Sequence, residues 1–240
     1  MVIAPFLAMT KAEFRANPNF SSPLAWMACH FSPYGTGVSN LPRQLPKGSL
    51  LILNDRTSWW CHDPRLILSQ LSQCIETLEC QGLLLDFQRA DVPEEARLAA
   101  LLCAELPCPV GVSEAYAGEL SCPVFLPPLP LGLSLADYLA PWQDREIWLE
   151  LALSRKEILL TEEGCTVTSL PSASDTGCEH QDTDSHCHYR ISVEENQARF
   201  TLYRTGDDLD SLLKDAASSG VSTTVGLWQE LHDSLPSCRK

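Results

Sequence analysis

Residues 81–88 read Gln-Gly-Leu-Leu-Leu-Asp-Phe-Gln, and this stretch decides the fold class. Three consecutive leucines follow Gly82, so both faces of the expected strand are apolar. A strand that is apolar on both faces is typical of a parallel sheet whose two faces are covered. The run stops at a carboxylate, Asp86, and an amide, Gln88. The sequence therefore predicts a buried parallel strand with polar groups at its carboxyl end.

The same kind of apolar run recurs along the chain, separated by amphipathic stretches. Asp63 is a candidate N-cap and Pro64 the first residue of a helix whose apolar positions run from Leu66 to Leu78. Alternating strands and helices predict an α/β fold, a (β/α)8 TIM-type barrel that is complete or reduced in size. An open doubly wound sheet is the alternative. Strands are expected at residues 2–9, 24–31, 49–55, 82–88, 108–115, 122–128, 146–152 and 223–230.

The composition is that of an ordinary globular protein, and we expect a single domain over residues 1–240. The chain is 45% hydrophobic and 20% charged, and its 17 basic and 31 acidic residues give a net charge of −14. This charge disfavours nucleic acid and anionic membranes as partners. No stretch resembles a secretion signal or a membrane span, which with eleven scattered cysteines predicts a cytoplasmic protein. No glycine-rich phosphate motif follows a strand, so no cofactor is predicted.

Residues 154–206 break the strand and helix alternation. Two stretches alternate polar and apolar residues around turn signals at Glu163-Gly164 and Glu195-Asn196, which predicts a small antiparallel β insertion. Residues 171–188, between them, are rich in Ser, Asp, Thr and Gly, and we expect a mobile polar loop there. This loop also carries side chains of the types that bind Zn²⁺. Their spacing fits no standard zinc motif, so metal binding is only the alternative for Cys178, His180, His186, Cys187 and His188.

Polar residues gather where the expected strands end. The carboxyl ends of parallel barrel strands share one rim, where such barrels build their sites. Trp59 and Trp60 follow one of these ends and are interpreted either as lids over the rim or as packing for their own loop. The rim candidates are Asn54, Asp55, Arg56, Asp86, Gln88, Ser113, Glu114, Glu150, Gln229 and Glu230.

The stretch at 81–88 resembles the fourth barrel strand of the family-18 glycoside hydrolases, the chitinases and related enzymes. That strand carries Asp-Gly-Ile-Asp-x-Asp-[Phe/Trp]-Glu in the family. Gly82, Asp86 and Phe87 match the pattern, whereas Leu84 stands in the place of an Asp and Gln88 in the place of the catalytic Glu. The resemblance implies the family's barrel fold, with a catalytic motif that is degenerate.

A second stretch, residues 202–231, is similar to the end of the family's domain. Acidic residues precede a Ser-Leu-x-x-Lys helix at 211–214, and a glycine-containing strand ends at Trp228. The antiparallel segment before it is similar to the α+β insertion of many family members. By the same resemblance, Trp228 would form the floor of a sugar pocket, with plain core packing as the alternative.

The chemistry that the resemblance implies is substrate-assisted hydrolysis, which needs a proton donor. An amide such as Gln88 has no proton to give at accessible pH. The first hypothesis is therefore a barrel that binds a glycan or another small polar ligand without chitinase-type hydrolysis, through Asp55, Asp86, Gln88, Trp228, Trp59 and Trp60. The second is a hydrolase with relocated carboxylates, for which the candidates are Asp86, Glu114, Glu150 and Glu230. A structural or protein-interaction role is the third.

Overall fold

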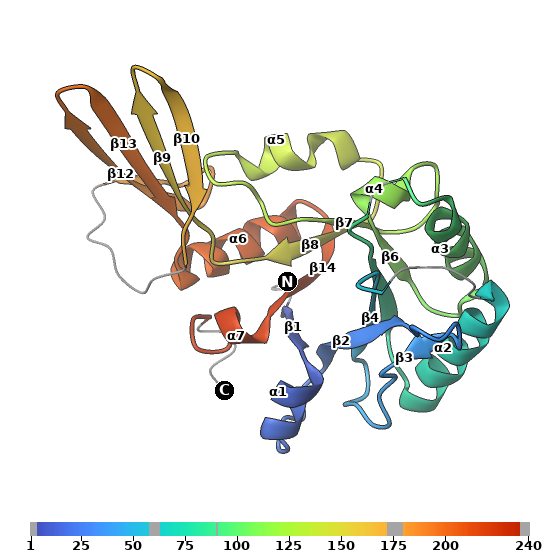
Figure 1. Ribbon diagram of the computed structural model, residues 1–240. Helices are drawn as coiled ribbons and strands as arrows, with labels where there is room; N and C mark the ends of the chain where they lie inside the picture. The colour runs from blue at the N-terminus through green and yellow to red at the C-terminus, as the bar shows by residue number, and fades with distance from the viewer. Residues whose placement is uncertain (1–3, 58–62, 90, 172–179, 236–240) are drawn as a thin grey trace.

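The computed structural model describes residues 4–57, 63–89, 91–171 and 180–235, and it shows a closed barrel (Figure 1). Eight parallel strands pair in a continuous order, and β1 pairs with both β14 and β2, so the sheet closes on itself. The expectation of a TIM-type barrel is thus confirmed, and the open sheet is excluded. The barrel strands are β1 (Phe6–Met9), β2 (Leu24–Phe31), β4 (Leu50–Asn54), β5 (Gly82–Asp86), β6 (Val110–Ser113), β7 (Val124–Leu126), β8 (Ile147–Leu151) and β14 (Val221–Leu227).

Helices cover the outside of this barrel (Figure 1). Asp63 caps the longest of them by accepting a hydrogen bond from the Arg65 backbone N–H at 2.9 Å, and Pro64 is its first residue, as predicted. The short strand β3 (Val38–Ser39) pairs antiparallel with β2. The helices are α1 (Lys11–Ala16), α2 (Pro64–Leu78), α3 (Pro93–Glu105), α4 (Glu114–Ala117), α5 (Leu135–Leu139), the 3-10 turn η1 (Ala140–Trp142), α6 (Gly206–Ser218) and α7 (Trp228–Leu231). Within the described residues, no helix is long and apolar enough to cross a bilayer.

The inside of the barrel is a small apolar core, to which almost every barrel strand contributes a side chain. Its buried residues are Ala8, Ala25, Leu50, Ile52, Leu84, Phe125, Trp148 and Val225. Alternate residues of a strand point to opposite faces, so Leu84 faces inward while Leu83 and Leu85 pack outward under the helices. Asp86 and Gln88 continue the inward-facing series at the end of β5.

Trp148 fills the part of this interior next to Gly111. A Cβ atom on Gly111 would lie only 2.3 Å from the Trp148 ring, so this position accepts no side chain without movement of the indole. One large ring opposite a glycine is how this narrow barrel is packed without a void.

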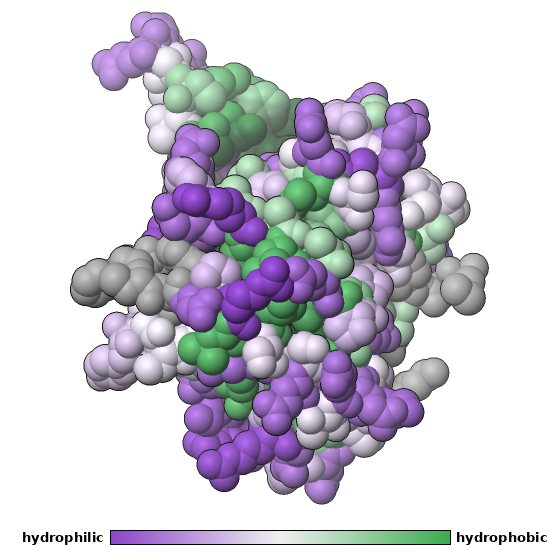
Figure 2. All heavy atoms as spheres, turned by 90° about the vertical axis from the view of Figure 1, so that its right-hand side faces the viewer, coloured by the Kyte–Doolittle hydropathy of each residue, from purple (hydrophilic) through white to green (hydrophobic). Residues whose placement is uncertain are grey.

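The insertion forms a separate five-stranded antiparallel sheet that stands away from the barrel (Figure 1). Two of its hairpins turn at 162–163 and 195–196, close to where the turn signals predict them. One face of the sheet is apolar, since Val193, Val167 and Leu160 are 75%, 58% and 40% exposed, and Figure 2 shows it above the barrel. Its strands are β9 (Arg155–Thr161), β10 (Gly164–Ser169), β11 (His180–Asp182), β12 (Cys187–Glu194) and β13 (Gln197–Tyr203).

The expectation of a mobile polar loop over 171–188 is wrong for residues 180–188. These residues form β11, a turn and the start of β12, while residues 172–179 lie outside the described part of the chain. The reason is a buried cation: the Arg204 guanidinium donates to the carbonyl oxygens of Ser185, His186 and Leu129 at 2.9–3.0 Å. These contacts hold the turn against the barrel, and His186 is only 5% exposed.

The packing of Trp148 against Gly111 predicts a cost for any added side chain. We expect Gly111→Ala to lower the free energy of unfolding by about 1–3 kcal/mol, because the added methyl group overlaps the indole. Urea denaturation followed by circular dichroism measures this. The double variant Gly111→Ala/Trp148→Leu should lose less than the sum of its two single variants. An unchanged midpoint for Gly111→Ala would contradict the packing described here.

Candidate functional site

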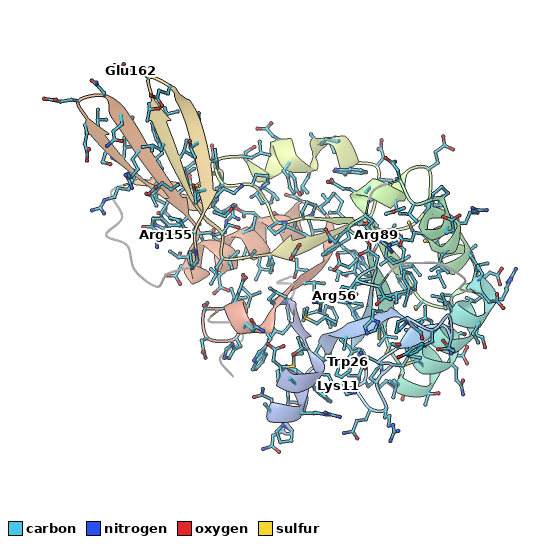
Figure 3. The ribbon with its side chains drawn as sticks, in the orientation of Figure 1. Lys11, Trp26, Arg56, Arg89, Arg155 and Glu162 are labelled. Atoms are coloured by element: carbon cyan, nitrogen blue, oxygen red, sulfur yellow. The ribbon has the colours of Figure 1, made fainter. Side chains whose placement is uncertain are left out.

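A pocket of about 290 Å³ opens at the carboxyl ends of the barrel strands. Its base is apolar and comes from the barrel interior, with Ile52, Leu84 and Phe125 among its residues. Its rim is polar and consists of Asn54, Asp55, Arg56, Asp86, Gln88 and Glu150. Six of the ten rim candidates named from the sequence therefore line one pocket, and Figure 3 labels one of them, Arg56, together with Arg89.

Parallel pairing of β4 with β5 brings the first group of rim residues together. Asn54 lies opposite Asp86 in the register, so the residues that follow both strands are neighbours. The Asp55 carboxylate accepts hydrogen bonds from the backbone N–H groups of Gln88 and Arg89 at 3.0 and 2.8 Å. Asp55 is 6% exposed and lines the pocket, but its Oδ2 is committed to the protein itself.

Arg89 connects Asp55 to a second buried acid. Its Nε donates to Asp55 at 3.2 Å, and its Nη2 donates to Glu95, whose side chain is fully buried. The Tyr116 hydroxyl lies 3.0 Å from Glu95 and also contacts the Arg89 carbonyl oxygen. Burial raises the pKa of Glu95, while Tyr116 and Arg89 oppose that rise, and burial with the nearby Glu95 raises the pKa of Tyr116 to about 12. We call Asp55, Arg89, Glu95 and Tyr116 the Arg89 network.

Asp86 and Gln88 face the pocket as a pair. The Gln88 side-chain amide donates to Asp86 Oδ1, whereas Arg89 is engaged by Asp55 and Glu95. Burial raises the pKa of Asp86, the hydrogen bond from Gln88 opposes this, and the Asp55 charge adds to it. Leu84 lines the same pocket one inward position earlier, so no carboxylate lies beneath Asp86 on β5.

Glu150, on β8, is the second carboxyl group of the pocket. Burial raises its pKa to about 7, and the charges of Asp86 and Glu230 add to the effect. Glu150 also lines a smaller hollow of about 140 Å³ together with Gln88 and the exposed Glu114. The barrel thus brings together three of the four catalytic candidates, Asp86, Glu114 and Glu150.

Glu230 lies close to this group but outside the lining of the pocket. Its Oε2 accepts a hydrogen bond from the Leu153 backbone N–H at 3.2 Å, so it holds the chain just after β8. Its contribution to the pocket is electrostatic, through Glu150.

Trp228 does not line the pocket, contrary to the expectation that it forms the floor. Its ring stacks on His232 with centroids 4.4 Å apart and meets the edge of Phe20 at 5.2 Å, outside the barrel wall. Leu227, the last residue of β14, lines the pocket in its place, whereas Trp228 is the first residue of α7. Trp59 and Trp60, the candidate lids, and Cys178 lie outside the described residues.

Pocket residues that the sequence analysis missed are mostly apolar. Phe125 and Met27 line the pocket from β7 and β2. The sequence holds no specific signal for them, because each is an apolar residue inside a strand, as many core residues are. The Tyr138 hydroxyl donates to the carbonyl oxygen of Pro127, which lines the adjacent hollow, at 2.7 Å; burial and the charges of Glu114 and Glu150 raise its pKa.

The histidines of the proposed zinc loop contact protein side chains. His188 Nδ1 lies 2.8 Å from Asp208 and His186 Nε2 lies 3.3 Å from Asp215, while His180 stacks on Tyr189. Cys187 is buried and lies 3.0 Å from the Ser185 hydroxyl. Across the described ranges, no three His, Cys, Asp or Glu side chains converge as metal ligands do. His186 and His188 instead attach the insertion to α6, and the contacts of His180 and Cys187 lie within the insertion itself.

Comparison with known proteins gives no match to a family model and no match to a curated protein. Solved structures, however, match nearly the whole chain. The spore cortex-lytic enzyme SleL of Bacillus cereus is 10% identical, with a TM-score of 0.57 over 98% of this chain and 72% of that one. The fold is that of the family-18 chitinases.

Two chitinases extend this likeness. The chitinase of Chromobacterium violaceum has a TM-score of 0.55 at 10% identity over 98% of this chain and 96% of its own. A family-18 chitinase of Cycas revoluta, solved as a mutant in complex with (GlcNAc)4, has a TM-score of 0.58 at 10% identity over 93% and 94%. At these identities the likeness is one of fold, and it places β5 as the fourth strand of a chitinase-like barrel.

The Arg89 network predicts that two neighbouring glutamates differ greatly in what they contribute to the free energy of unfolding. Glu95→Ala removes the buried partner of Arg89 and Tyr116, and we expect a loss of about 2–3 kcal/mol in unfolding free energy. Glu94→Ala removes only an exposed partner of Arg97 and should change it by less than about 0.5 kcal/mol. Urea denaturation of both variants checks this, and equal losses would contradict it.

The raised pKa of Glu150 predicts a specific pH dependence of stability. Unfolded Glu150 loses its proton near pH 4.5 but the folded protein keeps it to about pH 7, so its contribution to stability is full below pH 4.5 and is lost as pH rises through 7. Glu150→Gln should therefore be more stable than the parent at pH 8, by up to about 3 kcal/mol, and equal near pH 4.

Denaturation midpoints from pH 4 to 8 measure this difference. Glu119→Gln, the same change on an exposed side chain away from the pocket, is the control. Parallel curves for Glu150→Gln and the parent would show that Glu150 titrates normally.

Proposed function

We propose that this protein binds a glycan containing N-acetylglucosamine at the strand-end pocket and does not hydrolyse it by the chitinase route. One observation carries the proposal: Leu84 on β5 and Gln88 just after it line the pocket at the positions where the family that this strand resembles has its orienting aspartate and its acid. Neither an amide nor an isobutyl group can supply the proton that the reaction needs.

The chemistry of the pocket suits one sugar ring. Phe125, Met27 and Ile52 offer apolar surface for the ring face, and the polar rim offers several acceptors for hydroxyl groups. About 290 Å³ is at the small end of ligand pockets, which fits a monosaccharide unit better than a long chain. Asp86 and Gln88, joined by their hydrogen bond, present a fixed pair of polar groups toward it.

Proteins of the same fold support this class of ligand. The Cycas revoluta chitinase was solved with (GlcNAc)3 and with (GlcNAc)4, and a Nicotiana chitinase carrying a Glu-to-Gln mutation was solved with a tetrasaccharide. Loss of one glutamate in such a barrel is therefore compatible with a bound sugar chain.

Binding without turnover is the expected outcome for the parent protein. Isothermal titration with (GlcNAc)2 to (GlcNAc)4 should give saturable binding, and chromatography of the mixture should show no shorter oligomer. We expect Asp86→Ala to weaken binding about tenfold, because one charged hydrogen bond is lost. Asp144→Ala, an exposed aspartate outside the pocket, is the matched control. No heat and no shift in melting temperature with any oligomer would overturn the proposal.

A second candidate function is hydrolysis by a relocated acid. It is favoured by the Glu150 pKa of about 7, which leaves that carboxyl group partly protonated at neutral pH beside the carboxylate of Asp86. If oligomers are cleaved, Glu150→Gln should lower kcat by about 10²–10⁴-fold. Glu114→Gln, in the adjacent hollow, should have a smaller effect. Cleavage that survives Glu150→Gln would eliminate this candidate.

A further inference from the structure

A second hollow lies on the outside of the barrel wall, next to β2. The same strand also contributes to the lining of the strand-end pocket on the inside. At about 560 Å³ it is larger than the strand-end pocket. Trp26 and Met27 are consecutive on β2, and they point to opposite sides: Trp26 into this outer hollow and Met27 into the inner pocket. The two cavities are therefore separate sites on one strand.

The hollow exists because α1 is short. Six residues cannot cover the whole outer face of β2, and the segment 41–44 forms the opposite wall. Lys11, Phe14 and Arg15 are spaced at i, i+3 and i+4, so one face of α1 turns toward the space. Figure 3 shows the labelled Lys11 and Trp26 close together beside α1.

The charge of the lining is opposite to that of the protein. Lys11, Arg15 and Arg43 line the hollow, and no acidic residue does. The net charge of the chain is −14, so the protein as a whole is acidic. Three cations without an acid are therefore a local feature of this hollow. Within the described residues, the side chains of these three cations form no ion pair and no hydrogen bond. Glu13, the acid of α1, is turned away and accepts hydrogen bonds from Thr10.

The remaining lining is apolar except for Gln44. Phe14, Leu41 and Pro42 are half-buried, and the Trp26 ring, 4% exposed, supports Phe14 edge-on at 5.8 Å. The indole N–H of Trp26 is bonded to the Asn40 carbonyl oxygen at 3.0 Å, which fixes the ring in place. Unpaired cations beside an apolar wall match a ligand that has both negative charges and a ring.

We propose that this outer hollow, lined by Lys11, Phe14, Arg15, Trp26 and Arg43, binds a small molecule that joins two or more negative charges to a flat apolar ring. The guanidinium and ammonium groups contact the anionic part, and the ring lies against Phe14 and Pro42. No glycine-rich loop takes part, since side chains supply all the positive charge. The site does not depend on the sugar pocket or on its proposed function.

Three probes separate the two parts of this site. ATP carries adjacent charges and a ring, inorganic triphosphate carries only the charges, and adenosine carries only the ring. Isothermal titration at low ionic strength without Mg²⁺ should give saturable binding of ATP, binding of triphosphate at least about fivefold weaker, and none of adenosine. Triphosphate binding as tight as ATP, or no ATP binding, overturns the proposal.

Charge reversal locates the site. Arg15→Glu and Arg43→Glu should each weaken ATP binding about tenfold or more. Lys214→Glu, the same charge change on the exposed face of α6, should leave it within about twofold. Both arginines are exposed, so neither substitution should change the melting temperature. An unchanged melting temperature confirms that each variant is folded. Equal losses in all three variants would mean that ATP responds only to total charge, which also overturns the proposal.

Discussion

The buried carboxylate of Asp55 determines how the strand-end pocket is built. In-register pairing of β4 and β5 places Asp55 beside the backbone of Gln88 and Arg89, and one of its carboxylate oxygens, Oδ2, accepts from both N–H groups. Backbone N–H groups that are partly withdrawn from water still need an acceptor, and this contact holds the chain in place after β5. Arg89 then extends the support to Glu95 on α3. A helix outside the barrel thereby fixes a side chain at its rim.

The same burial that stabilises the barrel shapes the electrostatics of its rim. Asp86 and Glu150 both lie where a small apolar interior meets solvent, and burial raises the pKa of each. The charges of Asp86 and Glu230 add to the effect at Glu150 and bring its pKa to about 7, whereas the hydrogen bond from the Gln88 amide opposes the rise of the Asp86 pKa. The rim, which has the amide of Gln88 just after β5, therefore still contains a carboxyl group whose pKa is raised to about 7.

The insertion illustrates how side chains with metal-binding chemistry can serve a structural purpose. Arg204, 4% exposed, is satisfied by three carbonyl oxygens, and Asp208 accepts from both His188 and the Gln181 amide. A pattern of His and Cys in a polar stretch gives no indication of these partners, because Arg204 and Asp208 are some 20 residues away. The segment folds through contacts that are distant in the sequence.

By itself, the sequence determined the eight barrel strands, the capped helix at Asp63, the antiparallel insertion and the polar rim, since each depends on local periodicity or on where an apolar run stops. Only the tertiary structure decided which rim residues meet. It joined Asp86 to Gln88, set Glu150 beside them, committed Asp55 to the backbone and turned Trp228 outward. Closure of the barrel brings together strands that are up to about 220 residues apart, since β1 pairs with β14, and the direction of a side chain at a strand end is set by register and packing, which no local pattern encodes.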